Sequence, residues 1–129
     1  MPALPHPHLI VLRTAATVVI SCLIGQAGWA AAFIGGAGDY RPYHSVGALV
    51  TLVVSILSAV VYLVLRRSAG PVNVALAVGL AAGVGAQYAM GELGVASLHI
   101  FWGVLLVGLG TALTSWTYRH QMPAEGSVE

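Results

Sequence analysis

Charged residues are scarce in this sequence. Aspartate, glutamate, lysine and arginine together make up 7% of the 129 residues, lysine does not occur, and 58% of the residues are hydrophobic. A soluble domain normally carries about a quarter of its residues as charges. The composition therefore excludes an ordinary soluble domain and indicates an integral membrane protein whose surroundings are a lipid bilayer. The few cations form no basic patch, so nucleic acid is not expected as a partner.

The sequence also contains only one cysteine, and its start lacks the features of a signal peptide. The single cysteine, Cys22, lies in an apolar run, so no disulfide can form within the chain and a small buried side chain is expected. The start, MPALPHPHLIVLR, has no basic residue ahead of its apolar run, so we expect the first apolar segment to be a retained helix. His6, His8 and His120 lie near the chain ends and are expected in solvated tails.

Four apolar segments predict four membrane-spanning helices, at residues 14–34, 44–65, 72–90 and 97–118, with flexible tails at 1–12 and 120–129. Each segment has about 19 to 22 residues, and at 1.5 Å per residue this length crosses a hydrocarbon core of ~30 Å. The links are short, which makes consecutive helices antiparallel neighbours. The predicted fold is an all-α membrane protein: one transmembrane domain with four helices in an up-down-up-down bundle.

The arginines predict how this bundle is oriented. Four of them fall on one side of the predicted membrane: Arg13, Arg66, Arg67 and Arg119. Only Arg41 falls on the other side, where Asp39 and Glu92 also lie. Because cytoplasmic loops carry the excess of arginine and lysine, we expect both termini in the cytoplasm and Arg41 at the outer face.

Two histidines stand at matching positions in this arrangement. His44 begins the second predicted helix and His99 lies near the start of the fourth, and both helices run from the outer side inward. His44 precedes Arg66 by 22 residues and His99 precedes Arg119 by 20, so the imidazoles lie ~33 and ~30 Å from the inner arginines. A hydrated side chain at the membrane interface explains either histidine alone. The matched pair favours a ligand held between them.

A haem fits the distance expected between these histidines. The second and fourth helices of such a bundle are diagonal neighbours, with axes roughly 11–14 Å apart. That separation suits two imidazoles reaching to the two faces of a haem iron, whereas a bare metal ion has no third and fourth ligand nearby. Gly47 and Gly103 follow the histidines by three and four residues on the same helix faces, which leaves room for the macrocycle edge.

Further polar residues accompany the pair. Gln26 and Gln87 each lie in the apolar span that precedes a histidine helix, so the chain shows a faint repeat of two hairpins related by a pseudo-two-fold axis. Their role stays open between a contact with the cofactor and ordinary hydrogen bonding between helices. Arg41 is the outer cation expected to pair with a haem propionate. The candidate aromatic lining is Trp29, Phe101 and Trp102.

These segments resemble one half of a haem A synthase, the eight-helix membrane family built from two four-helix halves. LIGQAGWAAAFIGGAGDYRPYHSVGALV is similar to the first hairpin of a half, and LAAGVGAQYAMGELGVASLHIFWGVLL to its glutamine-bearing third helix and leucine-histidine fourth helix. The resemblance covers nearly the whole chain and implies axial-ligand roles for His44 and His99. The chain departs from the family in having one half, no cysteine pair in its outer loop, and no convincing acidic motif around Asp39.

The predicted function is therefore a small b-type cytochrome that binds one haem b through His44 and His99. It is expected to transfer electrons with a partner, such as a quinone or a larger respiratory complex. Two alternatives stay open: a homodimeric enzyme that modifies haem, in which two copies imitate the eight-helix family, and a cofactor-free accessory subunit of a larger membrane complex. Whether the chain is an enzyme is left open.

Overall fold

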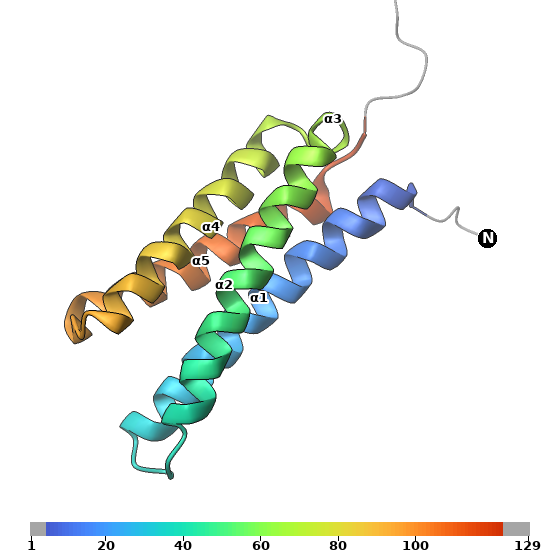
Figure 1. Ribbon diagram of the computed structural model, residues 1–129. Helices are drawn as coiled ribbons and strands as arrows, with labels where there is room; N and C mark the ends of the chain where they lie inside the picture. Colours follow the sequence, from blue (N-terminus) through green and yellow to red (C-terminus); the bar gives the residue numbers. More distant parts are fainter. Residues whose placement is uncertain (1–4, 123–129) are drawn as a thin grey trace, which may run out of the picture.

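The computed structural model describes residues 5–122, and within this range it is built of helices (Figure 1). The helices are α1 (Pro7–Ile34), α2 (Arg41–Val64), α3 (Arg66–Ala69), α4 (Pro71–Glu92) and α5 (Ala96–Arg119). No strand occurs between residues 5 and 122. The predicted all-α fold is confirmed, and α3 is a short helix within the link predicted between the second and third spans.

Helix α1 begins earlier than the sequence predicts. The tail expected over 1–12 is helical from Pro7, because proline at the first turn has the helical φ and gives up an N–H that would have no partner. The ring of His6 caps this end, since its Nδ1 accepts a hydrogen bond from the backbone N–H of His8 at 3.2 Å. Leu9 and Leu12 then bury against the bundle and hold the extra turns in place.

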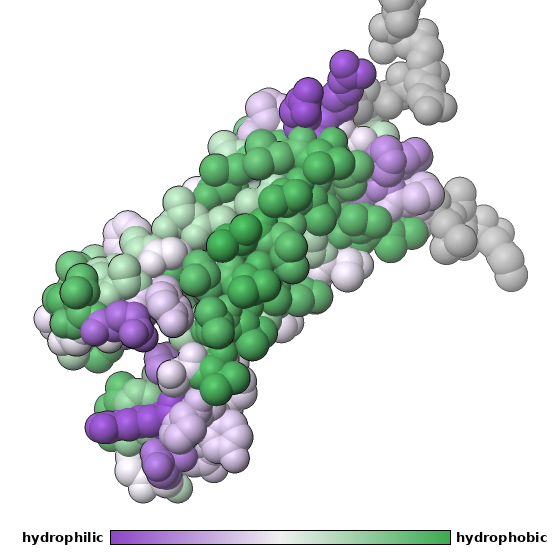
Figure 2. Space-filling model, in the orientation of Figure 1, coloured by the Kyte–Doolittle hydropathy of each residue, from purple (hydrophilic) through white to green (hydrophobic). Residues whose placement is uncertain are grey.

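The four long helices form the predicted up-down-up-down bundle. Each packs against two others, so that the order around the bundle is α1, α2, α4, α5, and α2 and α5 lie on a diagonal. Each of these four is long and apolar enough to cross a membrane. Hydrophobic side chains cover the middle of the molecule, while hydrophilic ones gather toward its two ends (Figure 2). The chain is a multi-pass membrane protein.

A buried polar network closes one end of the bundle, here called the arginine end because Arg13, Arg66, Arg67 and Arg119 lie there. Tyr62 of α2 is fully buried, and its hydroxyl donates to the backbone oxygen of Leu12 of α1 at 3.1 Å. The hydroxyl of Thr117 of α5 lies 2.6 Å from that of Tyr62 and 3.4 Å from the side-chain oxygen of Asn73 of α4. All four long helices are therefore joined by hydrogen bonds at this end.

The opposite end, here called the histidine end because His44 and His99 lie there, is open. The α1–α2 hairpin and the α4–α5 hairpin diverge toward it, and the space-filling view is notched between their tips (Figures 1 and 2). The buried core stops before this region, at Leu23 of α1, Val84 of α4 and Leu106 of α5. Between these residues and the tips, the two hairpins are not held together by a buried apolar layer.

Candidate functional site

The two histidines singled out by the sequence meet at the histidine end. Their rings come from α2 and α5, the diagonal helices, so they reach toward each other across the middle of the bundle. The ring centres lie 6.1 Å apart, and the ring planes are at 85° to each other. The structure therefore places next to each other two side chains that are 55 residues apart in the sequence.

Each imidazole is held by a backbone carbonyl of the helix before it. The Nδ1 atom of His44 lies 3.2 Å from the backbone oxygen of Gln26, and Nδ1 of His99 lies 3.0 Å from the backbone oxygen of Gln87. A carbonyl oxygen can only accept, so Nδ1 carries the proton in both rings and Nε2 keeps its lone pair. Histidines that bind metals are commonly oriented in this way by a carbonyl or a carboxylate.

The glutamine side chains bring buried polar atoms to the same place. The side-chain nitrogen of Gln87 lies 3.3 Å from Nε2 of His99. The other side-chain oxygen and nitrogen atoms of the two glutamines, Oε1 and Nε2 of Gln26 and Oε1 of Gln87, are buried without a hydrogen-bond partner among residues 5–122. A buried polar group without a partner costs about 1–3 kcal/mol. The site thus contains polar atoms whose hydrogen bonds the described residues do not provide.

The glycines beside the histidines make room for these glutamines. A Cβ built on Gly47 would run into the side chains of Gln26 and Trp29, and one built on Gly103 would lie 3.0 Å from Nε2 of Gln87. The sequence hypothesis gave this space to a macrocycle edge, whereas the structure fills it with a glutamine from the preceding helix. In both hairpins a glutamine therefore packs on the glycine that follows its histidine, in agreement with the faint repeat in the sequence.

Phe33 is a site residue that the sequence analysis did not single out. Its ring lies against His44, with ring centres 5.5 Å apart and planes at 64°. The guanidinium carbon of Arg41 lies 5.7 Å from the centre of the Phe33 ring, so the predicted outer cation reaches the site through this phenylalanine. Its position in the sequence could have indicated this role, because Phe33 follows Gln26 by seven residues and therefore lies on the same face of the helix.

The three aromatic residues predicted to line the site lie in different surroundings. Trp29 packs on Gly47, beside Gln26. The indole N–H of Trp102 donates to the backbone oxygen of Gly83 at 3.0 Å and ties α5 to α4. Phe101 is 61% exposed and contributes to the outer surface. Gly91 was not singled out, yet its lack of a side chain admits His99, since a Cβ there would lie 3.1 Å from Cε1 of that ring.

The remaining histidines lie at the arginine end, away from the site. Nδ1 of His8 is 2.8 Å from the hydroxyl of Ser68, and Nε2 of His120 is 2.9 Å from the backbone oxygen of the same residue. These two histidines, expected in solvated tails, instead attach the chain ends to α3. Among residues 5–122 no group of three or more His, Cys, Asp or Glu side chains is placed to hold a metal ion.

Comparison with known proteins identifies no relative of this chain. No family model, no curated protein and no solved structure matches the chain.

Proposed function

We propose that this chain is a small membrane cytochrome of b type that holds one haem b between His44 and His99. The observation that supports it is the spacing of the two imidazoles. Two imidazole nitrogens that bind one metal ion from opposite sides, each ~2.0 Å away, put their ring centres ~6 Å apart. The separation here is 6.1 Å, and because a carbonyl holds Nδ1 of each ring, Nε2 is the nitrogen of each ring available to a metal.

A haem suits a site with only two protein ligands. The porphyrin itself supplies four nitrogens, so two imidazoles complete the coordination, whereas a bare ion would need further side chains. A haem held by His44 and His99 would supply one-electron transfer rather than oxygen chemistry, because its iron would have no open position. No buried apolar layer joins the two hairpins at the histidine end, so a flat macrocycle between the histidines would displace no part of the core.

The chain's own residues orient the ligands. The backbone carbonyls of Gln26 and Gln87 accept hydrogen bonds from the two Nδ1–H groups, which fixes the tautomer and the orientation of each imidazole ring. The side-chain nitrogen of Gln87 lies 3.3 Å from Nε2 of His99 and would have to move for that nitrogen to bind a metal. Arg41, near the open end and in contact with Phe33, is the cation available for a propionate.

The wider assignment follows from the same site and from the arginines. The arginine end lies in the cytoplasm by the positive-inside rule, which puts the haem near the outer face. The resemblance to one half of a haem A synthase agrees with a haem held by the histidines of α2 and α5. A homodimeric enzyme that modifies haem and a cofactor-free accessory subunit are the competing assignments, and the following experiment separates them from the cytochrome.

The test is a reduced-minus-oxidised visible spectrum of detergent-purified protein from haem-replete cells, with the haem extracted and typed as its pyridine complex. We expect a sharp low-spin α band, one haem b per chain, and loss of haem in both His44→Ala and His99→Ala. His120→Ala is the matched control, because this histidine bonds to Ser68 at the other end, and it should retain haem. Haem surviving in both single variants, or colourless wild-type protein, refutes the proposal. Haem A in the host membrane favours the enzyme.

A further inference from the structure

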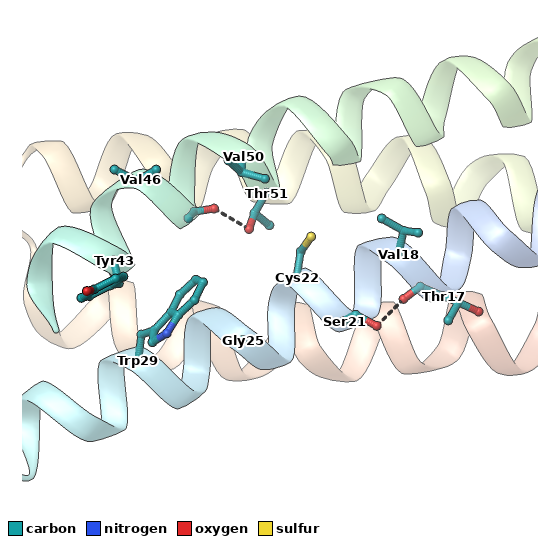
Figure 3. A pocket seen from close by; sticks show the side chains of 11 residues that line it. Thr17, Val18, Ser21, Cys22, Gly25, Trp29, Tyr43, Val46, Val50 and Thr51 are labelled. Atoms are coloured by element: carbon teal, nitrogen blue, oxygen red, sulfur yellow. Dashed lines mark hydrogen bonds between the residues drawn. The ribbon is translucent and has the colours of Figure 1, made fainter. Parts of the chain in front are cut away.

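A groove of about 500 Å³ opens between α1 and α2 on the surface that faces lipid (Figure 3). It runs along α1 from Thr17 to Trp29, twelve residues further on, which corresponds to ~18 Å. Tyr43 lies beside Trp29 at the histidine end of the groove. Within the predicted span 14–34, Trp29 lies toward the histidine end and Thr17 lies three residues from the arginine end. The groove therefore crosses the middle of the span and suits an extended apolar chain that enters from the histidine end.

The groove suits an apolar chain. None of its lining residues is charged. The hydroxyls along it are already bonded to their own helices, since Ser21 donates to the backbone oxygen of Thr17 at 2.8 Å and Thr51 donates to that of Gly47 at 2.7 Å (Figure 3). Because the donors of these serine and threonine hydroxyls are used within their own helices, this part of the wall is largely apolar.

In the other hairpin, side chains fill the space beside Gly83. Between α4 and α5, a Cβ on Gly83 would lie only 2.6 Å from Cδ2 of Leu106, and the indole of Trp102 bonds to the same glycine. On α1, by contrast, a Cβ on Gly25 would meet nothing within 4 Å. The space beside a glycine therefore differs between positions: side chains fill it at Gly83, and it is open at Gly25.

The mouth of the groove points to a neutral head group with oxygen acceptors. The indole N–H of Trp29 and the hydroxyl of Tyr43 are donors for which residues 5–122 provide no hydrogen-bond acceptor. The nearest cation in sequence, Arg41, lies over the Phe33 ring and does not line the groove, so a phosphate would find no partner. Carbonyl oxygens on an uncharged ring fit these donors better.

The mouth of the groove, at Trp29 and Tyr43, adjoins the proposed haem site. Tyr43 directly precedes His44, and Trp29 packs on Gly47 beside Gln26, the residue whose carbonyl holds the His44 ring. We infer that the groove binds an isoprenoid quinone, with its chain between α1 and α2 and its carbonyl ring at Trp29 and Tyr43. The choice of a redox-active ring over other neutral lipids rests on the proposed function, because a haem in the membrane needs an electron partner at this depth.

Binding is tested with decylubiquinone, a short-chain quinone, by its quenching of tryptophan fluorescence in detergent-purified protein. We expect saturable quenching in the wild type and at least a tenfold weaker affinity in Gly25→Phe, whose Cβ meets nothing within 4 Å and whose ring occupies the groove. Gly28→Phe is the matched control, since a Cβ on Gly28 also meets nothing within 4 Å and the residue lies outside the groove. Its affinity should equal that of the wild type.

A second pair of variants approaches from α2. Val50 lines the groove and is 49% exposed, whereas Val53 does not line it and is 48% exposed. Val50→Phe should weaken the binding of decylubiquinone, and Val53→Phe should leave it unchanged. Equal affinities within both pairs overturn the inference. So does displacement of the quinone by phosphatidylcholine, because the groove would then take ordinary acyl chains.

Haem content, typed in the same preparations, separates this inference from the proposed function. Haem retained in Gly25→Phe together with weakened quinone binding supports both. Haem retained with unchanged quinone binding refutes the groove alone. A colourless protein that still binds decylubiquinone in a Gly25-dependent manner refutes the cytochrome and leaves the quinone site standing.

Discussion

Replacing Gly47 by alanine tests how the site is packed. The added methyl group falls on the side chains of Gln26 and Trp29, so at least one of them must move. The amide end of Gln26 is flexible, but the Trp29 ring is rigid and fills the space beside it. The variant therefore disturbs the glutamine that supports His44, the tryptophan at the mouth of the groove, or both.

The size of the effect follows from two opposing terms. Forcing extra volume into a packed site costs about 1–3 kcal/mol, whereas replacing glycine by alanine inside a helix gains up to ~1 kcal/mol. The net change for Gly47→Ala is a loss of ~0–2 kcal/mol by these principles. In Gly103→Ala the methyl meets only the mobile end of Gln87 at 3.0 Å, so the two terms nearly cancel. In Gly28→Ala the methyl meets nothing, and only the gain remains.

The assay is the midpoint of thermal unfolding in detergent, measured with haem content for the three variants and the wild type. We expect Gly28→Ala to unfold at or above the wild-type temperature, Gly103→Ala close to it, and Gly47→Ala lowest and with the least haem. The series shares one substitution, so differences in helix propensity largely cancel. If Gly47→Ala were stabilised as much as Gly28→Ala, the packing of Gln26 and Trp29 against this glycine would be refuted.

Two further predictions concern the arginine end. Tyr62→Phe removes the hydroxyl that joins Leu12 and Thr117 and should lower the free energy of unfolding by ~1 kcal/mol. The control is Tyr88→Phe, whose hydroxyl forms no hydrogen bond within residues 5–122, and it should change the free energy of unfolding much less. Equal effects of the two substitutions would show that the network contributes nothing measurable. Green fluorescent protein fused after residue 129 should fluoresce and alkaline phosphatase at the same position should be inactive, as expected for a cytoplasmic C-terminus. The reverse pattern would overturn the proposed orientation.

The number and direction of the helices could be predicted because they depend on quantities that are local in the sequence. Apolar runs of about 20 residues need no knowledge of their neighbours to be identified, and short links leave only antiparallel pairs. The start of α1 could not be placed in this way. Pro7 and the following turns are helical because Leu9 and Leu12 bury against other helices, and burial is a tertiary property.

The candidate site was predicted in part. Matching depth on two inward-running helices was enough to pair His44 with His99, because helix rise converts sequence distance into membrane depth. The space beside Gly47 and Gly103 was assigned to a macrocycle edge, and the structure shows glutamine side chains there. A glycine indicates that something approaches the backbone, but its partner depends on how the helices are rotated about their axes. Sequence spacing does not specify that rotation.

The sequence by itself therefore determined the membrane class, the four spans, their antiparallel order and the two histidines at one level, since each follows from length, hydropathy or helical rise. Only the tertiary structure decided which atoms meet. The 6.1 Å between the rings, the carbonyls that hold both Nδ1 atoms, and the groove between α1 and α2 depend on helix rotation and on the divergence of the hairpins. These are set by side-chain packing among all four helices at once, from the buried network around Tyr62 to the open histidine end.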